Sequence, residues 1–265
     1  MYDFHTHSHY STDSSASMLS MARKGKNIGL SGICFTDHID LDYENPQASF
    51  DFSYGDYISE ISNIRASLPG NFEIFAGVEL GLQPHTLADN QELIRDRSYD
   101  FIIGSIHCVN KTDMYLDGFL KSMPTDDMAV TNYFMEMQLC IESFSNFDVL
   151  GHLDGVRRYI RDSESFSYEQ YREQIQNALK SLIRAHKGIE VNTSGLRYGL
   201  SSFHPLPEIL RLYKQLGGEI VTIGSDSHSP DTLGYRFKEA GEMLSDMGFK
   251  YYTIFKNRKP VFIKL

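Results

Sequence analysis

Three absences in the sequence limit the class of protein. No stretch approaches about 18 consecutive apolar residues, and the beginning has no basic stretch followed by an apolar run, so neither a membrane span nor a signal peptide is predicted. The three cysteines, Cys34, Cys108 and Cys140, are far apart and form no C-x-x-C pair, which is typical of a reducing compartment. We therefore expect a cytoplasmic protein with no membrane partner.

Positive charge is also scarce. The 265 residues include 25 Lys and Arg against 35 Asp and Glu, for a net charge of −10. Nucleic-acid affinity comes mostly from Lys and Arg that neutralise phosphates, so this balance argues against a nucleic-acid partner. The C-terminal segment 249–265 is locally basic, but its alternating Tyr, Ile, Phe and Val predict a closing strand or hairpin instead of a basic surface.

Short β-rich runs recur along the whole chain, separated by helix-like stretches. Residues 17–29 and 169–188 have apolar residues at helical spacing, and the second stretch is expected to end at Gly188. A strand followed by a helix, repeated about seven times, predicts a closed parallel α/β barrel in one domain, 1–265. The predicted strands are 2–7, 32–38, 72–80, 100–109, 147–154, 187–194 and 219–228.

Histidines and acids lie at the ends of six of these runs. In a parallel barrel the carboxyl ends of all strands meet at one face, where such enzymes carry their chemistry. Side chains alternate along a strand, so His5 and His7 lie on one side, as do Asp226 and His228, and each pair can hold one cation. The residues predicted to meet at this face are His5, His7, His38, Glu79, His107, His152, Asp226 and His228.

Four of the ten histidines do not lie at strand ends, and one of them, His9, is in the first loop. His9 continues the alternation, but the chain should have left the strand by then, so Asp13 is the better candidate ligand. A single histidine at a strand end is usually a hydrogen-bonded surface residue, but that explanation would have to hold for six of the ten histidines together. The interleaved Thr and Ser exclude a purification tag. We expect no role for His9, His85, His186 and His204.

Two arginines and one long connection complete the candidate site. Arg158 and Arg197 follow the fifth and sixth runs, where their guanidinium groups could fork onto phosphate oxygens or form surface salt bridges. The connection 39–57 is aromatic and acidic and could act as a lid. Its acids could pair with a cationic substrate group or form a solvated charged loop. They are Asp40, Asp42 and Glu44.

Six motifs together resemble the PHP superfamily, the polymerase and histidinol phosphatase family. They are H-T-H at 5–7, T-D-H at 36–38, G-V-E at 77–79, S-I-H at 105–107, G-H-L-D at 151–154 and S-D-S-H at 225–228. The match covers nearly the whole chain in order. G-H-L-D followed by Arg158, and E-V-N-T at 190–193 followed by Arg197, are similar to stand-alone L-histidinol-phosphate phosphatases. The resemblance implies a distorted, TIM-like (β/α)7 barrel with three divalent ions at the C-terminal ends of the strands.

The resemblance also implies a ligand set for each ion. The first ion takes His5, His7, Glu79 and Asp226, the second takes Asp13, His38 and His228, and the third takes His107 and His152 with Glu79 bridging. Glu190 and Asn192 at the sixth run supply no expected ligand, and we expect them to orient neighbours or contact substrate. Imidazole and carboxylate ligands without thiolate suit Zn, Fe or Mn equally.

The ligand types indicate a reaction. Three divalent ions would bring more positive charge than Asp13, Glu79 and Asp226 can neutralise, which would attract a phosphate monoester dianion. A hydroxide bridging the metals would be the nucleophile, and Asp226 would manage its proton. The candidate catalytic residues are Asp226, His228, Arg158 and Arg197, and the candidate substrate-binding residues are His38, Arg158 and Arg197.

The leading hypothesis is hydrolysis of L-histidinol phosphate to L-histidinol and phosphate in histidine biosynthesis, with this small phosphate monoester as the partner. One alternative is a related phosphoesterase that acts on another small phosphate ester or a nucleotide. A polymerase-associated nuclease or proofreading module would need a basic DNA track, which the net charge of −10 opposes. A non-catalytic metal-binding domain is the third alternative. The sequence does not decide the oligomeric state.

Overall fold

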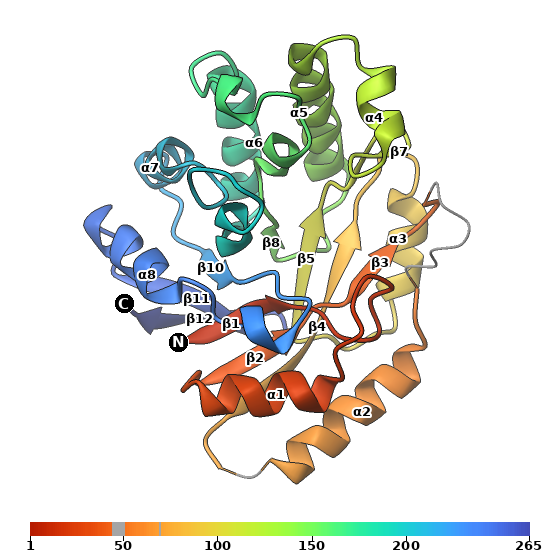
Figure 1. Ribbon diagram of the computed structural model, residues 1–265, viewed down its shortest axis with the longest axis vertical. Coiled ribbons are helices and arrows are strands. Elements are labelled where there is room, and N and C mark those ends of the chain that lie inside the picture. Colours follow the sequence, from red (N-terminus) through yellow and green to blue (C-terminus); the bar gives the residue numbers. More distant parts are fainter. Residues whose placement is uncertain (44–50, 69) are drawn as a thin grey trace.

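The computed structural model describes residues 1–43, 51–68 and 70–265. Parallel strands form its centre and helices surround them (Figure 1). An isolated bridge between Thr6 and Ser227 joins the first strand to the last and nearly closes the sheet. The predicted distorted (β/α)7 barrel is therefore confirmed. In spatial order the strands are β1 (Tyr2–Thr6), β2 (Gly32–Phe35), β4 (Glu73–Gly81), β5 (Phe101–Ser105), β8 (Val149–Leu150), β9 (Gly188–Asn192) and β10 (Val221–Gly224), and β3 (His38–Asp40) also pairs with β4.

The helices cover the outside of the barrel and bury one apolar face each. The Ser17 hydroxyl accepts a hydrogen bond from Ser20 N (3.2 Å) and caps the first helix, which buries Met18 and Met21. None of the helices in the described ranges is long and apolar enough to span a membrane. Their bounds are α1 (Met18–Asn27), α2 (Tyr54–Ser67), α3 (Leu87–Ile94), α4 (Asp117–Ser122), α5 (Asp126–Ser143), α6 (Arg172–Arg184), α7 (Pro207–Gln215) and α8 (Phe237–Asp246).

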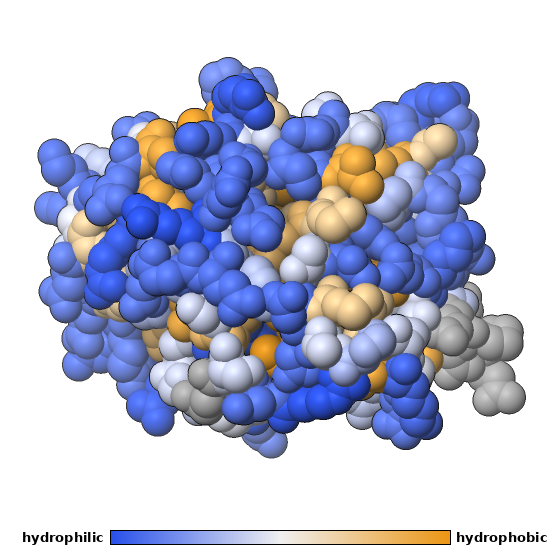
Figure 2. Space-filling view, turned by 90° about the horizontal axis from the view of Figure 1, so that it is seen from above, coloured by the Kyte–Doolittle hydropathy of each residue, from blue (hydrophilic) through white to orange (hydrophobic). Residues whose placement is uncertain are grey.

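Both helices predicted from apolar spacing are present but end earlier than expected. Gly29 has φ +82° after α1, and His186 has φ +55° after α6, so a left-handed residue stops each helix. Gly188, the predicted end of the second helix, is instead the first residue of β9. The face of the molecule in Figure 2 is mostly hydrophilic, with apolar side chains in separate groups.

The C-terminal segment forms the predicted hairpin. Strands β11 (Tyr251–Lys256) and β12 (Lys259–Lys264) pair antiparallel, and Asn257 and Arg258 both have positive φ in the tight turn. Phe255 of the hairpin stacks on Phe101 at the start of β5, with ring centroids 5.1 Å apart. The hairpin therefore packs apolar side chains against the amino-terminal end of the barrel strands.

The carboxyl ends of two strands differ from the prediction. His38 begins the short strand β3 and does not end β2, because the intervening Asp37 carboxylate accepts hydrogen bonds from Ser8 N (2.6 Å) and Ser11 N (3.1 Å). Strand β10 ends at Gly224, and Asp226 has φ +54°. The prediction that Asp226 and His228 alternate within one strand was therefore wrong, because the chain has already turned, but Asp226 Oδ1 still lies 3.7 Å from His228 Nδ1.

The connection predicted as a lid is shorter than expected. Residues 38–40 belong to β3 and α2 begins at Tyr54, so the connection runs over 41–53. Its middle, including Glu44, lies outside the described residues, and the lid stays a prediction. A second short hairpin, β6 (Cys108–Val109) with β7 (Thr112–Asp113), follows His107. Cys34, Cys108 and Cys140 are all buried, and none of them forms a disulfide within the described residues.

Candidate metal centre

Glu79, near the end of β4, lies at the centre of a buried group of histidines. Its Oε2 is 3.1 Å from His5 Nε2 and 3.0 Å from His38 Nδ1. Its Oε1 is 3.2 Å from His107 Nε2 and 3.1 Å from His152 Nε2. Burial alone would raise the pKa of Glu79, but His5, His38 and His107 lower that pKa well below its usual value. Glu79 is therefore an ionised carboxylate that imidazoles approach from four strand ends.

Asp226 is the second buried acid of the group. Its Oδ1 lies 3.5 Å from His7 Nε2, 3.8 Å from His5 Nε2 and 3.7 Å from His228 Nδ1. Its Oδ2 lies 3.3 Å from an Arg158 nitrogen. Burial alone would raise the pKa of Asp226, but these neighbours lower that pKa well below its usual value. Both central carboxylates are therefore held in the charged form, which metal ions require.

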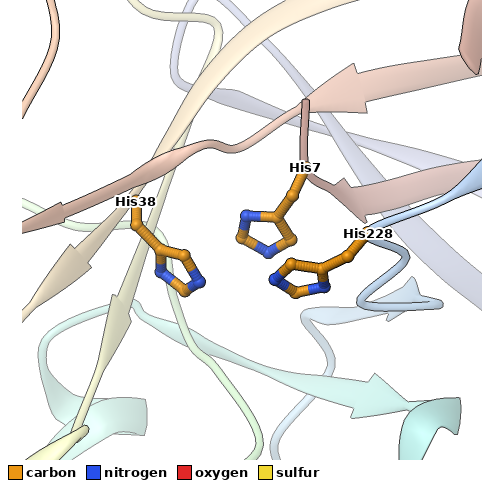
Figure 3. A group of neighbouring side chains, drawn as sticks. All are labelled: His7, His38 and His228. Atoms are coloured by element: carbon orange, nitrogen blue, oxygen red, sulfur yellow. The ribbon is translucent and has the colours of Figure 1, made fainter. Parts of the chain in front are cut away.

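Three imidazoles and Asp13 form the outer part of the group. Figure 3 shows the rings of His7, His38 and His228 turned toward one another, and the His7 centroid is 4.2 Å from that of His38 and 4.1 Å from that of His228. Asp13 Oδ2 lies 3.1 Å from His228 Nε2 and 3.7 Å from His38 Nε2. His9 lies apart, beside Glu60, with a side chain 43 % exposed.

His7 has the properties of a ligand. Its Nε2 is buried and makes no hydrogen bond to any residue that the structure describes. Burial and the neighbouring His228 and His38 lower the pKa of His7 well below its usual value, so the ring is neutral. A buried neutral imidazole nitrogen with no hydrogen bond costs free energy unless a cation coordinates it. This orphaned nitrogen fits a metal ion.

In the described part of the chain, three groups of residues bring their ligand atoms within 4.8 Å of one another. His38 belongs to two of them and lies nearer to Glu79 than to Asp13, so it stands between the ligand sets expected for the second and third ions. The donors are imidazole nitrogens and carboxylate oxygens, which suit divalent ions. The groups are His7, His38 and His228; His5, His7 and Glu79; and His38, Glu79 and His107.

Carboxylates behind the histidines orient two of the rings. His5 Nδ1 lies 2.6 Å from Glu190 Oε1, and His107 Nδ1 lies 2.8 Å from Asp40 Oδ1. Such contacts fix the orientation of a ligating imidazole and increase its basicity. An orienting role was expected of Glu190. No pattern in the sequence predicts this role for Asp40, because only the paired strands β3 and β4 bring it beside β5.

Arg158 is held by a chain of buried polar groups. It donates to Ser194 Oγ (2.5 Å), Asp226 Oδ2 (3.3 Å) and His204 Nε2 (2.9 Å). His204 Nδ1 in turn contacts Asp154 Oδ1, and burial and Arg158 lower the pKa of His204 to about 4. His204 is therefore neutral and accepts a hydrogen bond from Arg158. No role was expected of His204, because its partners are far away in the sequence.

Arg197 approaches the centre from the other side of Asp226. One of its terminal nitrogens donates to the backbone carbonyls of Ser225 (2.5 Å) and Asp226 (2.9 Å). Asn192 Nδ2 also donates to Asp226 Oδ2 (3.3 Å). The two candidate arginines thus reach the same acidic residue from η1 (Gly155–Arg158) and from the residue after η3 (Thr193–Leu196).

A pocket of about 630 Å³ opens over the centre. Its size suits a small molecule. His5 and His7 are fully buried behind it. Its lining includes Asp13, His38, Glu79, His107, His152, Arg158, Arg197, Asp226 and His228 from the predicted site, and also Asp40, Tyr43, Asp113, Met114, Tyr115, Leu116, Tyr159 and Tyr198.

Several known proteins are similar to this chain in sequence and in fold. A protein of Clostridium acetobutylicum named "Probable histidinol-phosphatase" is 32 % identical over 266 residues, covering 100 % of this chain and 97 % of that protein. One of the same name from Thermotoga maritima is 28 % identical and covers 100 % of both chains. The crystal structure of a histidinol phosphate phosphatase from Lactococcus lactis, complexed with Zn, L-histidinol and phosphate, has a TM-score of 0.89 at 27 % identity and covers 98 % of each chain.

A sequence model of the PHP domain matches residues 3–194, which include the first five histidines of the buried group but not Asp226 or His228. The order of the motifs, the near-closed barrel and the buried group of ligand atoms all agree with this match. The chain belongs to the PHP domain family.

Proposed function

We propose that this chain hydrolyses L-histidinol phosphate to L-histidinol and phosphate, a step of histidine biosynthesis, at a centre of three divalent ions. The chain is a metal-dependent phosphoric monoester hydrolase of the histidinol-phosphatase type. The observation that carries the proposal is the group of ligand atoms around Glu79, beneath a pocket that two arginines also line. We take residues 1–265 as one catalytic domain, because His5 and His228 contribute to the same centre.

The proposed ligand sets follow the contacts described above. When bound, divalent ions supply positive charge for the phosphoryl oxygens and lower the pKa of water. Zn, Fe and Mn all suit imidazole and carboxylate donors. His5, His7, Glu79 and Asp226 would hold the first ion, Asp13, His38 and His228 the second, and His107 and His152, with Glu79 bridging, the third.

The other residues bind the substrate and move a proton. Arg158 and Arg197 bind phosphate oxygens at the pocket edge, since both are fixed by protein contacts before substrate arrives. His38 and His228 border the same part of the pocket. Asp226 would manage the proton that the attacking water loses, because its Oδ1 lies among the histidines of the centre, 3.5 Å from His7 Nε2 and 3.7 Å from His228 Nδ1.

A substrate panel at fixed metal tests this function. We expect kcat/KM for L-histidinol phosphate to exceed that for p-nitrophenyl phosphate by at least about 100-fold, because only the first ester has an alcohol portion that matches the pocket. Chelation should abolish activity, and Zn or Mn should restore it. Equal specificity constants for the two esters would contradict the assignment of the substrate. Activity that survives exhaustive chelation would contradict the metal centre.

A further inference from the structure

Asp113 is a buried carboxylate that lines the pocket and belongs to none of the proposed ligand sets. Asp113 ends strand β7, in the hairpin that follows His107 directly. The residue is 6 % exposed, and it lines the pocket. Met114 N donates to the carbonyl of His107 (3.0 Å), so the hairpin is held against the strand end that carries a candidate ligand. Asp113 therefore lies in the pocket beside the centre.

Asp113 differs from Asp40 and Asp42 because it has no cationic partner in the part of the chain that the structure describes. Its Oδ1 accepts a hydrogen bond from Tyr115 N (2.9 Å), and its Oδ2 accepts one from the Tyr43 hydroxyl. Among the residues that the structure describes, it forms no ion pair, whereas Asp40 pairs with His107 (2.8 Å) and Asp42 pairs with His85 (2.8 Å). A buried carboxylate without a cation costs free energy, which a cationic ligand would offset.

The pocket wall around Asp113 suits the same kind of ligand. Tyr43, Tyr115 and Tyr159 all line the pocket, and aromatic faces attract cations and stack on planar rings. Met114 and Leu116 add apolar surface from the same loop. The pocket lining thus combines an anionic group, Asp113, and aromatic rings with two cationic side chains, Arg158 and Arg197.

We infer that Asp113 binds the protonated amine of the substrate and makes the pocket selective for phosphate esters of amino alcohols. This inference rests on the proposed function and names the residue that recognises the leaving group. The arginines bind the phosphate end and Asp113 binds the amine end, so only an ester with both groups engages both sides. Asp40 and Asp42, which the sequence offered for this role, are already engaged by His107 and His85.

The substitution Asp113→Asn tests the inference, because it removes the charge while keeping the size and the acceptor for Tyr115 N. We expect KM for L-histidinol phosphate to rise about 10- to 100-fold, as for a lost charge-assisted hydrogen bond, with less than about a threefold change for p-nitrophenyl phosphate. Inhibition by L-histidinol should weaken by a similar factor. Inhibition by inorganic phosphate should not change.

Asp117→Asn is the matched control. It makes the same substitution at an exposed acid four residues further along the chain that does not line this pocket, so selectivity should persist. If Asp113 only held the hairpin, Asp113→Asn would weaken both esters and both inhibitors equally, and that result would overturn the inference. Wild-type protein that does not prefer L-histidinol phosphate would contradict the proposed function. Wild-type preference that Asp113→Asn leaves intact would contradict this inference alone.

A second measurement does not depend on the folding of a variant. The wild-type protein is assayed with a phosphate ester that has the carbon frame and imidazole of L-histidinol phosphate but lacks the amine. We expect its KM to be about 10- to 100-fold higher than that of L-histidinol phosphate, because Asp113 then has no cation to bind. Equal KM values for the two esters would overturn the inference.

Discussion

The two ends of the barrel are stabilised in opposite ways. At the carboxyl ends of the strands, Glu79 and Asp226 are buried among imidazoles, and His7 Nε2 lacks a hydrogen bond within the described residues. At the amino ends, Phe101 packs on Phe255 of the hairpin, with ring centroids 5.1 Å apart, and on Phe4, at 5.3 Å. The hairpin ribbon lies beside the first strand in Figure 1. One end is arranged to receive cations, and the other end supplies apolar packing.

Acids at the amino end are also paired differently. Arg258 Nε lies 2.6 Å from Asp148 Oδ2, and an Arg65 nitrogen lies 3.0 Å from Asp100 Oδ2. These carboxylates have arginine partners within the protein, whereas the partners of Glu79 at the carboxyl end are imidazoles that are themselves candidate metal ligands. Mass action then predicts that metal stabilises the carboxyl end of the barrel, since ions bind the folded state preferentially.

The largest effect is expected at the carboxyl end, from Glu79→Gln. The substitution keeps the size of the side chain but removes the charge that four histidines surround, so metal content and turnover should fall together, turnover by about 1000-fold or more. Metal analysis and phosphatase assays measure both. Glu60→Gln, outside the centre, is the control and should retain both. If Glu79→Gln kept its full metal content and full turnover, Glu79 would not be a metal ligand.

Phe101→Ala should destabilise the amino-terminal end of the barrel. It removes a fully buried ring that contacts Phe4 and Phe255, so the free energy of unfolding should fall by about 3 to 5 kcal/mol. Urea unfolding measures this change. Metal content of the folded variant should match the wild type, because no candidate ligand is touched. Loss of metal without loss of stability would show that the two ends are not independent in the way described.

Arg197→Ala should change binding without changing metal content. The guanidinium lies at the pocket edge and contacts Asp226 only through the backbone carbonyl, 2.9 Å away. We expect KM for the phosphate ester to rise about 10- to 30-fold, with kcat reduced less. Steady-state kinetics and metal analysis on the same sample test this split. An unchanged KM would exclude Arg197 from phosphate binding.

The smallest effect concerns pH and His204. Burial, with Arg158 nearby, lowers the pKa of His204 to about 4, below the unfolded value near 6.5. As pH falls from 6.5 toward 4, the unfolded chain gains a proton that the folded chain does not, so stability is lost in that window. Between pH 7 and 5 the wild type should lose about 1 to 2 kcal/mol more than His204→Gln, measured by urea unfolding in excess chelator. Equal losses would show that His204 is not held neutral.

Local patterns in the sequence were informative where one element decides the outcome. Strand period and helix spacing predicted the barrel and the C-terminal hairpin, and the residue types at strand ends pointed to the face where Glu79 and Asp226 now lie among histidines. Alternation failed at Asp226, because a positive φ of 54° follows the end of β10. The alternation of side chains along a strand does not predict where one residue adopts a positive φ and the strand ends.

Periodicity and residue types alone therefore sufficed for the architecture and for the donor chemistry, because both depend on neighbours a few positions apart. The tertiary structure alone decided which buried polar side chains contact one another in the site. Asp40 reaches His107, His204 reaches Arg158, and Asp113 is left in the pocket without a basic partner among the described residues. These partners lie tens of residues apart in the chain. Only the packing of neighbouring barrel strands and their loops brings them within hydrogen-bonding distance, and burial makes each unpaired charge costly enough to matter.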